Sequence, residues 1–246
     1  MNIIPLSEGV FTIDKTKIFV PFNFENDDLQ QRPAGSLLVE VQPFVVITRK
    51  DILLLDTGLG FSKNNELQIY TNLAAHNILP GDITKVLLTH LHKDHAGGIS
   101  KKDRLGNYST AFPNAKYFVQ QKELAFAMDT GFPSYMTEEI SVLQNNKQVE
   151  VLNGNGIIDD YISYEITGAH SPYHQVYWIK ENEKIFFFGG DDAPQLQQMK
   201  NKFVAKYDYD GKKCMHLRQQ WWKEGNEKNW TFLFYHDVKT PVYPEQ

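Results

Sequence analysis

The residues with the clearest chemical potential in this chain lie in the segment from 89 to 98, Thr-His-Leu-His-Lys-Asp-His-Ala-Gly-Gly. In extended backbone, residues two apart point the same way, so His90 and His92 can present two imidazoles to one ion. After the chain turns, Asp94 and His95 can face a second ion nearby. Imidazole with carboxylate suits zinc best, with iron, manganese and cobalt as alternatives. The competing interpretation is a polar surface loop, which so dense a group of ligands disfavours, and we predict a metalloenzyme.

The elements around this cluster alternate between strands and helices. Apolar, partly β-branched residues at 84–89 predict a buried strand that runs into it. The same patterns predict further strands at 37–48, 51–56, 115–120, 148–152, 161–167, 174–180, 184–189 and 230–235, and helices at 64–77, 121–129 and 214–224. We expect one domain spanning residues 1–246, built from two αβ halves of approximately 1–140 and 141–246.

Three further candidate ligands each follow one of these predicted strands: His170, Asp191 and His236. Alone, a histidine after a strand is usually a surface residue, and Gly-Asp is usually a turn. Ligands at the ends of adjacent strands can converge on one rim of a sheet. With the first cluster they make seven ligands, enough for two ions that share one carboxylate.

The amino-acid composition limits the classes of partner that we expect for this protein. The 246 residues carry a formal net charge of −5, so we expect no nucleic-acid partner, because phosphate binding needs clustered lysine and arginine. The single cysteine, Cys214, excludes an intramolecular disulfide and a thiolate metal site. No secretory signal or membrane span is recognisable, which favours a cytoplasmic protein without a membrane partner.

These motifs resemble the metallo-β-lactamase superfamily of dinuclear zinc hydrolases. The His-x-His-x-Asp-His signature is matched by residues 90–95 and the Gly-Asp element by Gly190-Asp191. The segment 168–174 is similar to the family's Gly-His-[Ser/Thr]-Pro-Gly-His element, with Ala169 and Tyr173 as departures and His174 in a supporting role. Asp56 corresponds to the strand-end aspartate that supports the histidine loop. The resemblance implies a mixed α/β (α+β) fold, the four-layer αββα sandwich.

The resemblance also implies how the ligands divide. One Zn²⁺ would take His90, His92 and His170. The other would take Asp94, His95 and His236, with Asp191 bridging. A bridging hydroxide would attack the substrate's acyl carbon, and Asp94 could carry its proton to the leaving group. Iron or manganese could replace zinc. Asp192 is either an acid that orients a ligand histidine or an exposed turn residue.

The branch of the superfamily decides the substrate. The chain resembles the lactonase and arylesterase-like branch, which implies a small-molecule lactone or ester substrate and a homodimer. The sequence Asp192-Ala-Pro-Gln195 lacks the tyrosine that quorum-quenching lactonases carry after the bridging aspartate. Thioesterase and phosphotriesterase activities stay open. So do a mononuclear-iron, persulfide dioxygenase-like redox protein and a non-hydrolytic metal-binding relative.

Overall fold

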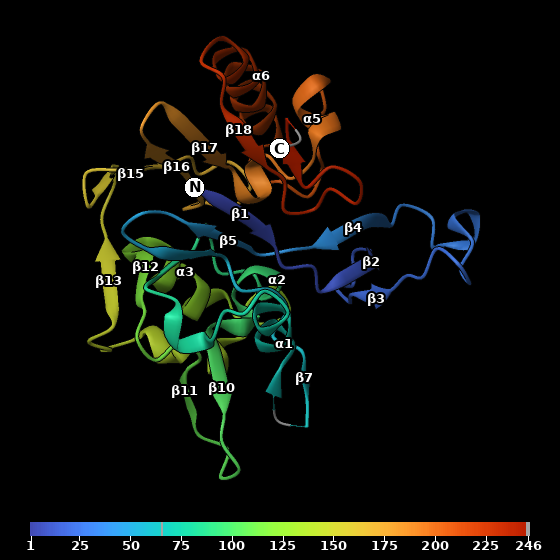
Figure 1. Ribbon diagram of the computed structural model, residues 1–246. Coiled ribbons are helices and arrows are strands. Elements are labelled where there is room, and N and C mark those ends of the chain that lie inside the picture. Colours follow the sequence, from blue (N-terminus) through green and yellow to red (C-terminus); the bar gives the residue numbers. More distant parts are fainter. Residues whose placement is uncertain (65, 245–246) are drawn as a thin grey trace.

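The computed structural model describes residues 1–64 and 66–244. Two six-stranded sheets face each other in it (Figure 1). The first sheet has the strand order β1 (Asn2–Pro5), β5 (Phe44–Ile47), β6 (Ile52–Leu55), β9 (Lys85–Leu87), β12 (Lys116–Gln120) and β13 (Val149–Leu152). The second has the order β14 (Gly156–Ile158), β15 (Ile162–Ile166), β16 (Gln175–Glu181), β17 (Lys184–Phe188), β18 (Thr231–Leu233) and β19 (Val242–Tyr243).

Helices cover the outer face of each sheet (Figure 1). The first sheet carries α1 (Gln68–Ala74), α2 (Lys93–Ala96), α3 (Gln121–Thr130) and α4 (Thr137–Ile140), and the second carries α5 (Leu196–Lys200) and α6 (Gly211–Glu227). Smaller sheets are formed by β2 (Gly9–Ile13) with β3 (Val20–Pro21) and β4 (Leu37–Val41), by β7 (Ser62–Lys63) with β8 (Glu66–Leu67), and by β10 (Ser100–Lys102) with β11 (Tyr108–Thr110). The predicted four-layer αββα sandwich is confirmed.

Three hydrophobic clusters hold these layers together. The cluster between the sheets includes Phe44 and Leu55 from the first sheet and Tyr177 and Phe188 from the second. A second cluster fills the space between the first sheet and its helices, and a third packs α5 and α6 on the second sheet. Each central strand therefore buries both faces, which explains why these strands are continuous apolar runs rather than alternating ones.

The prediction of one strand over residues 37–48 is wrong. The segment forms two strands that belong to different sheets: β4 pairs with β2, and β5 pairs with β1 and β6. Gln42 and Pro43 separate them. A proline lacks the N–H that a continuous ladder needs, so the chain passes from one sheet to the next at this point.

Other predicted elements are found with shifted boundaries. The helix predicted over 64–77 is confined to α1, because β7 and β8 form a hairpin before it. Residue 65 of that prediction lies outside the described residues. The helix predicted over 214–224 is longer, since Asp210 caps α6 by accepting a hydrogen bond from the Lys213 N–H.

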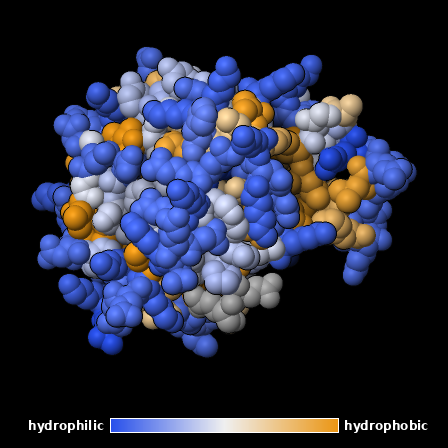
Figure 2. All heavy atoms as spheres, turned by 90° about the horizontal axis from the view of Figure 1, so that it is seen from above, coloured by the Kyte–Doolittle hydropathy of each residue, from blue (hydrophilic) through white to orange (hydrophobic). Residues whose placement is uncertain are grey.

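The segment between β2 and β4 projects from the body of the molecule (Figure 1). It exposes apolar side chains, including Ile18, Val20 and Phe24, and Figure 2 shows apolar surface gathered on this side of the protein. The homodimer stays a prediction, and this segment is its candidate interface. Among the described residues, no helix combines the length and apolar character needed to cross a membrane.

Candidate metal centre

Strand direction explains why distant residues meet at one edge of the fold. In the second sheet, β15 and β17 both run antiparallel to β16, and β18 runs parallel to β17. The carboxyl ends of β15, β17 and β18 therefore lie at the same edge, and His170, Asp191 and His236 follow them. The histidine cluster follows β9 in the facing sheet.

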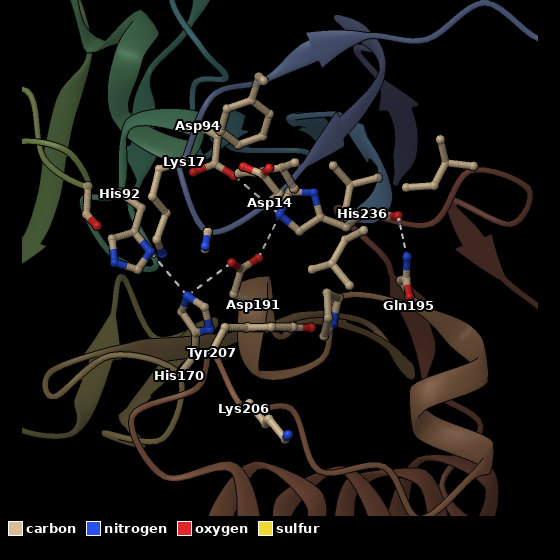
Figure 3. Close-up of a pocket in the computed structure, with 18 of the residues that line it drawn as sticks. Asp14, Lys17, His92, Asp94, His170, Asp191, Gln195, Lys206, Tyr207 and His236 are labelled. Atoms are coloured by element: carbon tan, nitrogen blue, oxygen red, sulfur yellow. Dashed lines mark hydrogen bonds and ion pairs between the residues drawn. The ribbon is translucent and has the colours of Figure 1, made fainter. Parts of the chain in front are cut away.

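All seven residues predicted as ligands come together at this edge. Figure 3 shows the five of them that line the cavity: His92, Asp94, His170, Asp191 and His236. They form two groups in which the ligand atoms lie within 4.8 Å of one another: His90, His92, His170 and Asp191, and then Asp94, His95, Asp191 and His236. Asp191 belongs to both groups. One carboxylate between two clusters of nitrogen and oxygen atoms is the arrangement expected of a two-cation site.

Hydrogen bonds at Nδ1, the ring nitrogen that points away from the centre, fix the ring orientation of four of the histidines. The partners of Nδ1 are Thr89 Oγ1 for His90 (3.0 Å), Asp56 Oδ2 for His95 (2.7 Å), Asp208 Oδ1 for His170 (2.9 Å) and the Glu40 carbonyl for His236 (2.6 Å). Each of these Nδ1 atoms can donate its proton to an oxygen. The Nε2 lone pair then faces the centre, where a metal would lie.

His92 is oriented the other way. Its Nδ1 lies 2.9 Å from Nε2 of His90 and 3.1 Å from Nε2 of His170, so three imidazole nitrogens face one another. In the second group, Nε2 of His95 and Oδ1 of Asp191 are buried without a hydrogen-bond partner, although they lie 3.1 Å apart. Buried polar atoms normally have partners. A cation in each group would supply them, so the residues present fit two divalent ions.

The protonation states of the predicted ligands agree with metal binding. Burial and neighbouring histidines hold the pKa of His90 and His92 well below the usual range, so both imidazoles are neutral and able to bind metal. Burial opposes protonation of His236, but Asp191 and Asp94 raise its pKa to about 10. Burial would raise the pKa of Asp94, yet His95 and His236 lower it to about 2. Metal binding in the second group must therefore displace protons from histidine.

Asp56 fixes the loop that carries the first cluster, as expected. Besides holding His95, its carboxylate accepts hydrogen bonds from the Thr89 N–H and hydroxyl, both at 2.8 Å. The turn that follows Asp56 packs directly on the end of the loop. A Cβ added to Gly60 would lie 2.2 Å from the Gly97 carbonyl oxygen, so these two glycines permit the close approach.

His174 and Asp192 contact each other and hold the backbone of two predicted ligands, Asp191 and His170. Nδ1 of His174 lies 3.0 Å from Asp192 Oδ2, and its Nε2 lies 3.3 Å from the Asp191 backbone N–H. Asp192 is fully buried and also accepts a hydrogen bond from the His170 N–H at 2.7 Å. Of the two interpretations of Asp192, the orienting acid is correct, although it acts on His174 and on the backbone of His170.

Asp208 is a functional candidate that the sequence did not reveal. It lies in the loop between α5 and α6, its side chain is 1% exposed, and it holds His170. The neighbouring Tyr207 lines the cavity beside the same histidine, with ring centroids 6.2 Å apart. A tyrosine thus reaches the cavity from this loop rather than from the residues directly after Asp191. The 201–210 segment has no motif or period that could have indicated this.

A cavity of about 640 Å³ opens onto the two ligand groups, a volume suited to a small molecule. Its lining includes the apolar side chains of Ile13, Phe19, Leu37, Leu38, Val39 and Pro194. Cys214 is buried, and Trp221 packs in the cluster beneath α6. His76 and His216 are exposed on the surface.

Comparison with known proteins agrees with the fold. The model of the metallo-β-lactamase superfamily matches residues 39–212, and the chain belongs to this superfamily. It is a family of metal-dependent hydrolases. The expected resemblance to its lactonase-like branch is confirmed, since N-acyl homoserine lactonases are among the similar sequences and structures.

Three curated relatives illustrate the range of identity and coverage. The chain is 28% identical over 180 residues to the probable metallo-hydrolase YybB of Bacillus subtilis, covering 73% of this chain and 68% of YybB. It is 28% identical over 171 residues to an N-acyl homoserine lactonase of Bacillus thuringiensis, covering 61% of this chain and 62% of that protein. It is 36% identical over 104 residues to the uncharacterized protein C03F11.2 of Caenorhabditis elegans, covering 42% of this chain and 25% of that protein.

Solved structures show the same fold. A probable metal-dependent hydrolase from Staphylococcus aureus has a TM-score of 0.79 at 22% identity, covering 98% of this chain and 91% of that one. AidC, a dizinc quorum-quenching lactonase, has a TM-score of 0.70 at 18% identity, covering 98% and 88%.

Proposed function

We propose that this protein hydrolyses a lactone or ester of a small molecule with the aid of two bound zinc ions. The observation that carries the proposal is the pair of ligand groups that share Asp191 beneath the cavity. In this assignment, His90, His92 and His170 hold one ion. Asp94, His95 and His236 hold the other, and Asp191 bridges them.

Two divalent cations in these groups would make hydroxide available from water at neutral pH and polarise the acyl carbonyl. The chain's own residues position the centre and limit the access of water. His90 and His95 are fully buried and held at Nδ1, so their ring positions are set before substrate arrives. The apolar lining of the cavity reduces the access of bulk water to the reacting bond.

Asp94 is the proposed proton carrier. Its side chain lines the cavity, and Oδ2 lies 3.4 Å from Nε2 of His236. Since His95 and His236 lower the pKa of Asp94 to about 2, the carboxylate is ionised at neutral pH and would hold the proton of the attacking water only briefly as that water adds to the acyl carbon. When the ester C–O bond breaks, the same proton can pass to the departing oxygen, which leaves an alcohol and a carboxylic acid.

The second ligand group favours a hydrolase over a one-iron oxygenase. An oxygenase with one iron would need only the first group, whereas Asp94, His95 and His236 are buried and assembled around Asp191 as well. The N-acyl homoserine lactonase among the relatives supports a lactone or ester rather than a thioester or phosphotriester.

Turnover on a panel of substrates tests the proposal. We expect hydrolysis of lactones or aryl esters, loss of turnover on chelation, and recovery on addition of Zn²⁺. Thioesters, phosphotriesters and a β-lactam complete the panel. Absence of hydrolysis across the panel with zinc-loaded protein, or consumption of oxygen by iron-loaded protein, would contradict it.

A further inference from the structure

Four lysines line the cavity above the ligand groups: Lys15, Lys17, Lys93 and Lys206. They come from three separate parts of the chain. Lys15 and Lys17 follow β2, Lys93 begins α2 directly before the ligand Asp94, and Lys206 lies in the loop between α5 and α6. Figure 3 shows Lys17 on the side of His92 and Asp94, and Lys206 on the side of Tyr207. Folding therefore gathers positive charge around one cavity.

These lysines have no carboxylate partners within the described parts of the chain. With a limit of 4.0 Å, the lysine ion pairs of residues 1–64 and 66–244 involve Lys85, Lys116 and Lys228. Lys17 and Lys93 are both half-buried, and Nζ of Lys93 lies 5.9 Å from the ring centroid of Phe19. Both lysine side chains are thus partly withdrawn from water, and neither forms an ion pair with a carboxylate of the described residues.

The carboxylates that line the cavity are already engaged. Asp14 accepts hydrogen bonds from the N–H and the hydroxyl of Thr16, at 2.9 and 2.5 Å. Asp94 and Asp191 belong to the ligand groups and would be neutralised further by divalent ions. In a chain with a formal net charge of −5, a cavity with more cations than carboxylates is a local reversal of sign. Such a field attracts anions.

The same cavity has an apolar wall. Ile13, Phe19 and Leu37 come from the projecting segment and its flanking strands, and Phe19 lies next to Lys93. A hydrocarbon chain can pack on this wall while a charged end reaches the ammonium groups. Apolar surface beside unpaired lysines therefore fits an amphipathic ligand better than a purely apolar one.

We propose that the substrate carries an anionic group, a carboxylate or a phosphate, joined by an apolar chain to the bond that is cleaved, and that Lys17 and Lys93 bind this group. The proposal rests on the proposed function, since it names the substrate class of the same site. A lysine ammonium acts as a point charge, so it selects for negative charge without distinguishing carboxylate from phosphate by shape.

Matched esters test the proposal. One substrate is the mono-nitrophenyl ester of adipic acid, which keeps a free carboxylate; the second is the same ester with that carboxylate methylated; the third carries a phosphate in its place. We expect kcat/KM to be higher for the anionic esters by up to about fivefold for each lysine that pairs with the anion, the upper end for partly exposed charge pairs, and the advantage to shrink with added salt. The ratio of the two anionic esters identifies the preferred group.

Variants assign the effect to the lysine. Lys17→Gln should raise KM for the anionic esters and remove most of their advantage, and Lys17→Arg should restore it. Lys101→Gln is the control, because Lys101 is exposed on β10 and does not line the cavity. Equal kcat/KM for the charged and methylated esters, or an advantage unchanged in Lys17→Gln, would overturn the proposal.

A binding measurement separates this proposal from the proposed function. Hexanoate and adipate share a chain length and one carboxylate, and adipate has a second. Calorimetric titration of the metal-loaded protein should show tighter binding of adipate, with the difference lost in Lys17→Gln. If neither ester is hydrolysed and this difference is present, the hydrolase proposal fails and the anion site stands. Equal affinities for both acids would refute the anion site whatever the turnover.

Discussion

Replacing Asp208 by alanine should weaken the binding of one metal ion and spare the other. The Asp208 carboxylate lies 2.9 Å from Nδ1 of His170, and its side chain is 1% exposed. Without it, the proton on Nδ1 loses its acceptor and the ring is free to turn, so Nε2 is less often directed at the centre. Removal of such a partner typically costs about ten- to a hundredfold in metal affinity, or about 1.4 to 2.8 kcal/mol.

The loss should fall on the first ligand group, because His170 belongs to that group and not to the second. Competition with a chromophoric chelator, followed through both binding steps, measures the two affinities separately. Asp208→Asn keeps an acceptor oxygen and should lose less. Asp129→Ala is the matched control, since Asp129 is exposed at the end of α3. Unchanged affinities in Asp208→Ala, or an equal loss in both steps, would refute the positioning role of Asp208.

Two further predictions concern the turn that follows Asp56, where Glu8 accepts a hydrogen bond from the Leu59 N–H and Gly60 packs against Gly97. Burial raises the pKa of Glu8 from 4.5 to about 7, against the hydrogen bond from the Leu59 N–H at 2.6 Å, so its stabilising contribution is complete below pH 4.5 and is lost as the pH rises to 7. In the metal-free protein, Glu8→Gln should therefore gain about 2.5 kcal/mol relative to wild type between pH 5 and pH 8 in urea unfolding. The exposed Glu25→Gln is the control, and parallel curves for Glu8→Gln and wild type would count against this. Gly60→Ala should cost at least about 1 to 3 kcal/mol and reduce metal affinity, because φ is +71° and the new Cβ would meet the Gly97 carbonyl oxygen at 2.2 Å. Gly35→Ala shares a positive φ of +79° with open space around it, so an equal loss in both variants would show that the contact with Gly97 has no role.

The sequence was sufficient to select the seven residues that the fold brings together, and insufficient for the residues that surround them. His90, His92, Asp94 and His95 were predictable because four ligands in one short segment leave few other uses for them. His170, Asp191 and His236 were predictable because each follows an apolar strand, and strand ends meet at one edge of a sheet.

Asp208 and Lys17 could not be predicted in the same way. Both lie in irregular segments without periodicity, and only the tertiary structure brings them to the cavity. The break at Pro43 was visible in the sequence, but the strong apolar run on both sides outweighed it in the prediction of a single strand. Local patterns indicate which residues can do chemistry, whereas loop placement decides which neighbours tune it.

The most direct test of the two-ion centre is the metal content of the wild-type protein and of Asp191→Ala, measured by elemental analysis after loading with Zn²⁺ and removal of the excess. Asp191 belongs to both ligand groups, so we predict about two ions per chain in the wild type and reduced occupancy of both sites in the variant. A wild type that holds one ion, or a variant that retains two, would contradict the assignment of Asp191 as the shared ligand.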